Sequence, residues 1–126
     1  MTDILAGTVP QSLPDTFSSQ RPWGQFEQYT LNEQTTVKVI TVEPGARLSK
    51  QRHTHRAERW QVLDGPVDVE VDARSWTASH DEVVWVPRGS IHRMGNSGAS
   101  PVRILEIGYG HFDEDDIERL QDDYRR

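Results

Sequence analysis

The chain has 126 residues, which is enough for one domain and too few for a second hydrophobic core. Its 14 lysines and arginines against 20 aspartates and glutamates give a net charge of −6, which argues against nucleic acid or an anionic membrane surface as a partner. The absence of cysteine excludes disulfides, thiolate metal ligands and thiol nucleophiles. A metal would have to be bound by histidine, carboxylate or amide groups.

The first twenty residues differ in composition from the rest. Residues 1–20 contain two prolines and several serines, threonines and glutamines, which predicts an extended or disordered lead-in. They have neither the basic region nor the apolar run of a signal peptide, and no stretch approaches the roughly 20 apolar residues of a membrane span. We therefore expect a cytoplasmic protein without a membrane partner, with residues 21–126 forming a single domain.

Beyond the lead-in, the sequence is typical of short strands. Side chains alternate through Thr35–Val42, and this segment ends at the turn Pro44-Gly45. Further β-type segments, each bounded by Gly, Pro, Asp or Asn, are Arg47–His53, Arg59–Leu63, Val67–Val71, Arg74–Ala78, Glu82–Val86, His92–Met94 and Val102–Ile107. Because no βαβ spacing is present, these strands predict an all-β domain, an antiparallel barrel or sandwich.

The C-terminal segment is the acidic part of the chain. Residues 111–126 hold seven acids and three arginines, and so account for −4 of the net charge. Within this segment, residues 113–126 are predicted to form a helix, because Asp113 can cap its first turn and Ile117, Leu120 and Tyr124 are spaced three and four apart. We expect this amphipathic helix to lie against the barrel.

Two separate segments carry side chains that can bind a metal. In the first, Gln51, His53 and His55 alternate along a strand and so share one face, and Glu58 follows after a short turn. In the second, a Pro-x-Gly turn precedes His92. Since either segment alone also occurs on solvated strands, the prediction depends on their combination. Imidazole, carboxylate and amide groups suit a divalent Zn, Mn, Co, Ni or Fe ion.

The two segments together resemble the motifs of the cupin superfamily, which are small antiparallel β-barrels of the double-stranded β-helix or jelly-roll type. Gln51 stands where the first histidine of the usual cupin motif stands. Residues 21–126 resemble the type II phosphomannose isomerase domain through Arg21–Gly24, Pro44–Ser49, Gln51–Trp60, His92-Arg93, Asp115–Ile117 and Asp122–Tyr124. In that family the domain usually forms the C-terminal part of a bifunctional enzyme, whose mannose-1-phosphate guanylyltransferase part is absent from this sequence.

The resemblance implies interconversion of mannose 6-phosphate and fructose 6-phosphate, a reaction that supplies polysaccharide synthesis. It implies a homodimer, and a divalent metal with four ligands, Gln51, His53, Glu58 and His92. His55 could take the place of Gln51 or touch the substrate. Arg56 resembles the functional arginine of the family.

Aldose–ketose isomerisation needs a base, a group that polarises the carbonyl and a group that binds phosphate. His55 and Glu106 are the candidates for the base, although Glu106 could instead be a structural carboxylate paired with an arginine. Arg56 could stabilise the enediolate or bind phosphate, and the further phosphate candidates are Lys38, Arg47 and Arg88. The bases clustered between residues 47 and 59 favour a small phosphorylated sugar as the substrate.

Two other functions fit the same residues. One is a metal-binding cupin with different small-molecule chemistry, such as another sugar isomerase or an oxygenase. The other is a non-catalytic carbohydrate-binding module. Both stay open because Arg59 follows Glu58 where the family usually has histidine, and because the transferase part is missing.

Overall fold

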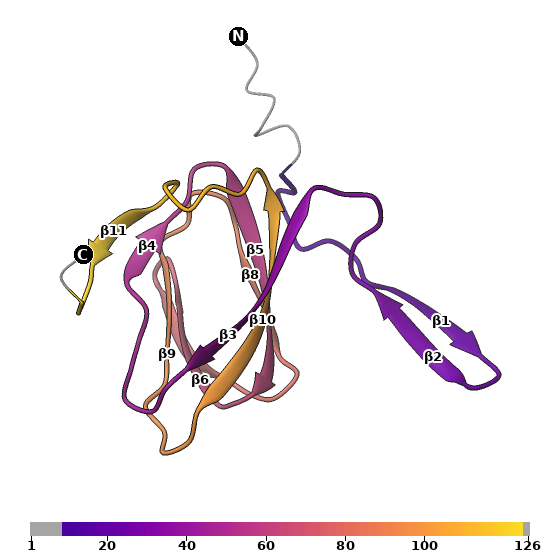
Figure 1. Cartoon of the computed structure of the whole chain (residues 1–126), viewed down its shortest axis with the longest axis horizontal. Helices are drawn as coiled ribbons and strands as arrows, with labels where there is room; N and C mark the ends of the chain where they lie inside the picture. The colour runs from indigo at the N-terminus through magenta and orange to yellow at the C-terminus, as the bar shows by residue number, and fades with distance from the viewer. Residues whose placement is uncertain (1–8, 125–126) are drawn as a thin grey trace, which may run out of the picture.

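The computed structural model describes residues 9–124, which form eleven strands and no helix (Figure 1). Within this range there is accordingly no helix that could cross a membrane. The strands are β1 (Phe17–Arg21), β2 (Gly24–Gln28), β3 (Thr35–Val42), β4 (Lys50–Arg52), β5 (Arg56–Asp64), β6 (Val67–Val71), β7 (Arg74–Ala78), β8 (Val83–Val86), β9 (His92–Gly95), β10 (Val102–Gly110) and β11 (Glu118–Gln121).

Two antiparallel sheets face each other and make the body of the molecule (Figure 1). One sheet has the strand order β3-β10-β5-β8, and the other has the order β11-β4-β9-β6-β7. The long strand β10 pairs along its length with β3 on one side and β5 on the other. Strands that are distant in sequence, such as β4 and β9, therefore lie side by side.

The interior between the sheets is apolar at one end and polar at the other. Valines that alternate along β6 pack against inward-facing residues of the opposite sheet, including Trp60 and Ile104, which are 2% and 1% exposed. Farther along β5 and β10, the strands that carry Trp60 and Ile104, the inward positions are occupied by Glu58 and Glu106, which are both buried. Since burying a charged group is costly unless it has a partner, the polar end is the place to look for a site.

The all-β prediction is confirmed, and three predicted strands, Thr35–Val42, Val67–Val71 and Arg74–Ala78, have the predicted bounds. The expected closed barrel is not formed. Hydrogen bonding does not continue around the body, because β3 and β8 end one sheet while β11 and β7 end the other. The domain is a two-sheet sandwich whose sheets lie face to face.

The predicted C-terminal helix over residues 113–126 is wrong. Asp113 does cap a turn, accepting the Asp115 amide at 2.9 Å, but the turn is single and β11 follows it. Side chains of the body hold this strand in an extended form, because the Arg52 guanidinium binds Glu118 at 2.8 Å and Arg93 binds Gln121 at 3.0 Å. These tertiary contacts override a helical pattern that is only moderately favourable. Residues 125–126 lie outside the described range.

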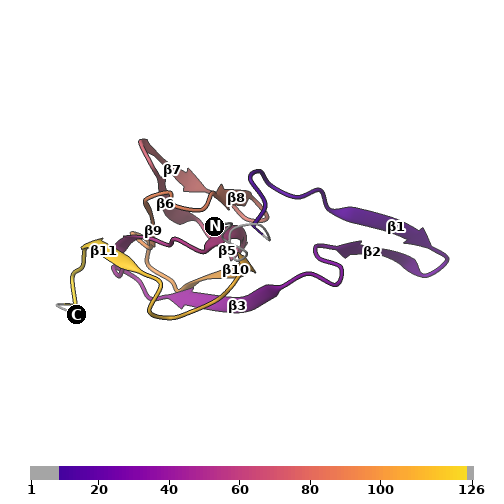
Figure 2. The ribbon, with the colours of Figure 1, turned by 90° about the horizontal axis from the view of Figure 1, so that it is seen from above.

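A hairpin of β1 and β2 projects from the body (Figure 2). It includes residues 17–20, which the sequence assigned to the lead-in, whereas residues 1–8 lie outside the described part of the chain. Its strands meet at the turn Pro22-Trp23, where the Trp23 side chain is 73% exposed.

Candidate metal centre

The two metal-binding segments of the sequence meet at one end of the sandwich. His53 lies in the loop between β4 and β5, Glu58 lies on β5, and His92 begins β9. The Gly89 amide donates a hydrogen bond to the His53 carbonyl at 2.9 Å, which ties the loop to the turn before β9. The imidazole rings of His53 and His92 lie 4.9 Å apart.

Three donor atoms converge between these residues. His53 Nε2 lies 3.4 Å from Glu58 Oε2, and His92 Nε2 lies 3.5 Å from Glu58 Oε1. One ligand atom from each of the three residues falls within 4.8 Å of the other two. All three residues are buried, with exposures of 3%, 2% and 1% for His53, Glu58 and His92. The three side chains are close enough to share one ion.

Hydrogen bonds fix which nitrogen of each imidazole faces the cluster. His53 Nδ1 lies 2.7 Å from the Asp116 carbonyl, and His92 Nδ1 lies 2.9 Å from the Ser90 carbonyl. Because a carbonyl can only accept, both Nδ1 atoms must carry the proton and donate it. Each Nε2 then faces the Glu58 carboxylate. His92 Nε2 has no hydrogen-bond partner among the described residues, as expected of a nitrogen positioned to bind a metal.

Two donors hold the Glu58 carboxylate in place. Arg56 Nε donates to Oε2 and Trp60 Nε1 donates to Oε1, each at 3.1 Å. Burial alone would raise the pKa of Glu58, but its interactions with His92, His53 and Arg56 lower it below 4.5. We attribute the lowering chiefly to Arg56, because a guanidinium stays charged at every relevant pH, whereas burial favours a neutral His53. Glu58 is therefore ionised.

The protonation of His53 also suits metal binding. Burial lowers the pKa of His53 below its ordinary value of 6.5, and the charge of Arg56 lowers it further, although Glu58 opposes both effects. The imidazole is therefore neutral at pH 7. Since metals bind the neutral ring and the ionised carboxylate, His53 and Glu58 are both in the form that a divalent ion requires.

A cavity of about 190 Å³ opens onto the cluster. Among the residues that line it are His53, Arg56, Glu58 and Gln51. Gln51 on β4 is paired in register with His92 on β9, so both side chains lie on the same face of the sheet. Its Oε1 accepts a hydrogen bond from the Ser49 hydroxyl at 3.2 Å. Gln51 thus lies beside the three converging ligands.

Glu106 lines the same cavity and is 7% exposed. Burial and the negative charge of Glu58 raise the pKa of Glu106 to about 8, against the opposing charges of Lys38 and Arg56. Lys38 is its cross-strand partner on β3 and also lines the cavity. The cavity therefore contains an ionised carboxylate, Glu58, and a second carboxyl group that is mostly protonated at pH 7.

The other predicted site residues lie elsewhere. His55 is in the loop after His53, where its amide donates to Asp116 Oδ2 at 2.8 Å, and it is not one of the described residues that line the cavity. Arg88 is exposed in the turn before β9. Arg47 pairs with Asp123, through Nε at 2.7 Å and Nη2 at 3.0 Å. Of the predicted phosphate-binding residues other than Arg56, Lys38 lines the cavity, whereas Arg47 and Arg88 do not.

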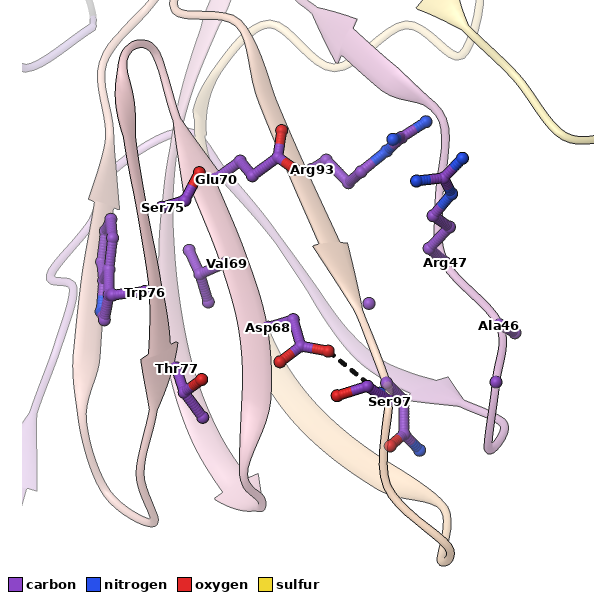
Figure 3. Close-up of a pocket in the computed structure, with 13 residues that line it drawn as sticks. Ala46, Arg47, Asp68, Val69, Glu70, Ser75, Trp76, Thr77, Arg93 and Ser97 are labelled. Carbon is purple, nitrogen blue, oxygen red and sulfur yellow. Dashed lines mark hydrogen bonds between the residues drawn. The ribbon is translucent and has the colours of Figure 1, made fainter.

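A larger hollow of about 580 Å³ lies on the outer face of the sheet that contains β6 and β7 (Figure 3). Arg47, Asp68, Glu70 and Arg93 line it, and none of the candidate metal ligands does. Most of these groups already have partners. Arg93 Nε donates to the Leu48 carbonyl at 2.9 Å, and Asp68 accepts the Ser97 amide at 3.0 Å. The converging donor atoms lie instead at the smaller cavity between the sheets.

Sequence reasoning missed four residues that shape the site. Trp60 supports Glu58, and its position two residues later on the same strand could have revealed this, because alternate side chains share a face. Ser90 acts through its backbone carbonyl, which leaves no signal in side-chain type. Asp116 acts through both its carbonyl and its carboxylate. Arg119 lines the cavity from β11, and the prediction of a helix concealed it.

Relatives of known description match most of the chain. It is 43% identical over 107 residues to the alginate biosynthesis protein AlgA of Pseudomonas aeruginosa, covering 84% of this chain and 22% of that protein. It is 37% identical over 107 residues to the mannose-1-phosphate guanylyltransferase ManC of Salmonella typhimurium, again covering 84% and 22%. The chain therefore spans about a fifth of the length of these relatives.

Solved structures share the fold. The capsular polysaccharide assembling protein CapF of Staphylococcus aureus has a TM-score of 0.64 at 20% identity, covering 85% of this chain and 34% of that chain. The cupin domain of Schizosaccharomyces pombe Cnp3 has a TM-score of 0.58 at 19% identity, covering 79% and 86%. The fold is thus cupin-like. The family described as mannose-6-phosphate isomerase C-terminal matches residues 13–122, and the chain belongs to that family.

Proposed function

We propose that this chain is a metal-dependent isomerase domain that interconverts mannose 6-phosphate and fructose 6-phosphate. The observation that carries the proposal is the convergence of buried His53, Glu58 and His92 beside a cavity that His53 and Glu58 line, within a chain of the mannose-6-phosphate isomerase C-terminal family. Hydrogen bonds at the Nδ1 atoms turn the Nε2 atom of each imidazole toward the carboxylate, as binding of one ion requires.

His53, Glu58 and His92 would hold the ion, and Gln51 Oε1 is the proposed fourth ligand because it lies on the same sheet face as His92. Two histidines, a carboxylate and an amide oxygen accommodate Zn, Mn, Co, Ni or Fe. Such an ion, when bound, polarises the oxygen on a substrate carbon and so favours the enediol.

The protein side chains would supply the remaining steps. Isomerisation moves a proton between C1 and C2, and Glu106 is the proposed carrier because it is a buried carboxyl group of the cavity beside Glu58, whereas Glu114 is exposed and His55 lies outside the lining. Arg56 is held between Glu58 and His53, with Nη2 3.2 Å from His53 Nε2. From that position it fixes the carboxylate ligand and adds positive charge where an enediolate would develop.

A coupled assay on metal-replete protein tests this function. Wild type should convert mannose 6-phosphate to fructose 6-phosphate, and His53→Ala should lose at least about 100-fold in rate because one ligand of the ion is gone. His80→Ala is the matched control, since His80 lies outside the cavity and its side chain is 70% exposed. Equal rates in wild type and His53→Ala, or no turnover by wild type with any of the five metals, would refute the proposal.

A further inference from the structure

Arg119 brings a positive charge to the candidate metal centre from the end of the chain. It lies on β11 and lines the inner cavity together with His53 and Glu58. In the sheet it is paired in register with Gln51, which is in turn paired with His92. Cross-strand partners point to the same face, so Arg119, Gln51 and His92 form one row on the cavity face of the sheet, with Arg119 exposed at its edge.

The neighbouring position on β11 points the opposite way. Glu118 is paired with Arg52, and their side chains form an exposed ion pair at 2.8 Å. Because side chains alternate along a strand, an outward Glu118 is consistent with an inward Arg119. The alternation therefore agrees with the place of Arg119 in the cavity lining.

Among the described residues, the other cationic side chains of the cavity have carboxylate partners. Lys38 Nζ lies 3.3 Å from Glu114 Oε1, and Arg56 Nε lies 3.1 Å from Glu58 Oε2. Within residues 9–124, the Arg119 guanidinium forms no ion pair or hydrogen bond. The charge at this side of the cavity is therefore available to an anionic ligand.

The distance between Arg119 and the metal ligands suits a substrate with a reacting end and a charged end. Neighbouring strands are about 4.8 Å apart, so the Cα of Arg119 lies two strands, or roughly 10 Å, from that of His92. In a hexose 6-phosphate the reacting carbons are C1 and C2, whereas the phosphate is on C6. One end of such a sugar can reach the metal ligands while the other reaches Arg119.

We propose that Arg119 binds the phosphate group of a hexose 6-phosphate whose C1–C2 end lies at His53, Glu58 and His92. This assignment rests on the proposed function and names the residue that gives the site its preference for phosphorylated sugars. A guanidinium is suited to the task, because its N–H groups can bind two phosphate oxygens at once. Arg119 touches the substrate but not its reacting atoms.

The test compares Arg119→Gln with wild type in the full chain, by calorimetric binding of inorganic phosphate and of fructose 6-phosphate and by isomerase kinetics. We expect about tenfold weaker binding of both ligands, and a KM raised about tenfold with kcat changed by less than about threefold, because phosphate binding is equal in the ground and transition states. Arg119→Lys should recover part of the affinity, since it keeps the charge but not the bidentate geometry.

Arg103→Gln is the matched control, because Arg103 is a half-exposed arginine that pairs with Asp64, away from β11 and outside the cavity lining. Thermal unfolding of each variant verifies that the fold is kept. Phosphate binding and KM within about twofold of wild type in Arg119→Gln would overturn the assignment. So would an equal loss of phosphate binding in Arg103→Gln, because the effect would then come from general surface charge.

The calorimetric measurement of phosphate binding distinguishes a failure of this assignment from a failure of the proposed function. If wild type binds phosphate through Arg119 but isomerises no hexose 6-phosphate, the assignment stands and the isomerase proposal fails. If wild type is an active isomerase and Arg119→Gln matches it in KM and in phosphate binding, the isomerase proposal stands and the assignment fails.

Discussion

His53 Nδ1 donates a hydrogen bond to the backbone carbonyl of Asp116 across 2.7 Å, although 63 positions separate the two residues in the chain. The same aspartate accepts the amides of Thr54 and His55 through its carboxylate, each at 2.8 Å. Asp116 therefore fixes both the ring orientation of a candidate metal ligand and the loop that carries it. The acidic C-terminal segment is a structural part of the candidate metal centre.

Replacing Asp116 with alanine should weaken metal binding about tenfold, because the loop that carries His53 would lose two charge-assisted hydrogen bonds. Isothermal titration of the metal-free chain with Zn²⁺ or Mn²⁺ measures the effect. Asp115→Ala is the control, since the Asp115 side chain is exposed and, among residues 9–124, Asp115 is hydrogen bonded through its amide alone. Equal affinity in both variants would show that the carboxylate of Asp116 does not position the ligand.

Replacing Glu106 with glutamine should lower kcat at least about 100-fold and leave metal affinity within about threefold, because the amide keeps the shape of the side chain but cannot carry the proton. The measurement is the coupled isomerase assay, with metal affinity determined in parallel. Glu43→Gln, a change in an exposed turn, should have no effect on either quantity. An unchanged kcat in Glu106→Gln would remove Glu106 as the proton carrier.

The pKa of Asp123 should lie below its ordinary value of 3.8, because the Arg47 side chain donates hydrogen bonds to its carboxylate and adds a positive charge. The ion pair should therefore persist above pH 3.8 and be lost as the pH falls through the lowered pKa. An NMR titration of the side-chain carboxyl measures it. In Arg47→Gln the pKa should rise toward 3.8, and a value that does not change would show that the pair is absent in solution.

Replacing Ile104 with alanine should lower the free energy of unfolding by about 2–5 kcal/mol, because the side chain is 1% exposed and its loss leaves a cavity between the sheets. Thr41→Ala, on the outer face of β3, should change it by less than about 0.5 kcal/mol. Urea denaturation measures both. Similar losses in the two variants would contradict the assignment of inner and outer faces.

Much of the fold could be predicted because its strands depend on local signals. The alternation in Thr35–Val42 and the turns at Gly and Pro set most strand bounds. The meeting of the two metal-binding segments agrees with the sequence-based expectation, since His53, Glu58 and His92 converge. The expected strand that would place Gln51, His53 and His55 on one face ends at Arg52, because His53 and His55 lie in the loop before β5. The hairpin before residue 30 was missed because its strands are mostly exposed and lack a clear alternation.

What could not be predicted depends on contacts that are remote in sequence. The spacing of Ile117, Leu120 and Tyr124 fits a helix, but the Arg52–Glu118 and Arg93–Gln121 contacts draw the segment into a sheet. The basic residues between positions 47 and 59 were expected to attract phosphate, yet Arg47 and Arg52 form ion pairs with the acidic segment.

Because a helix was predicted for this segment, two of its contacts were not foreseen. These are the hydrogen bond of Asp116 to His53 and the position of Arg119 at the cavity.

The most direct test of the account is the number of divalent ions bound per chain, measured by equilibrium dialysis of the metal-free protein and elemental analysis, in wild type and Glu58→Gln. The account predicts one ion per wild-type chain, with isomerase activity rising in proportion to occupancy. It predicts about 100-fold weaker binding in Glu58→Gln, because the only ionised ligand of the converging set is lost. A wild-type chain that binds none of Zn, Mn, Co, Ni or Fe, or equal binding by the two proteins, would contradict it.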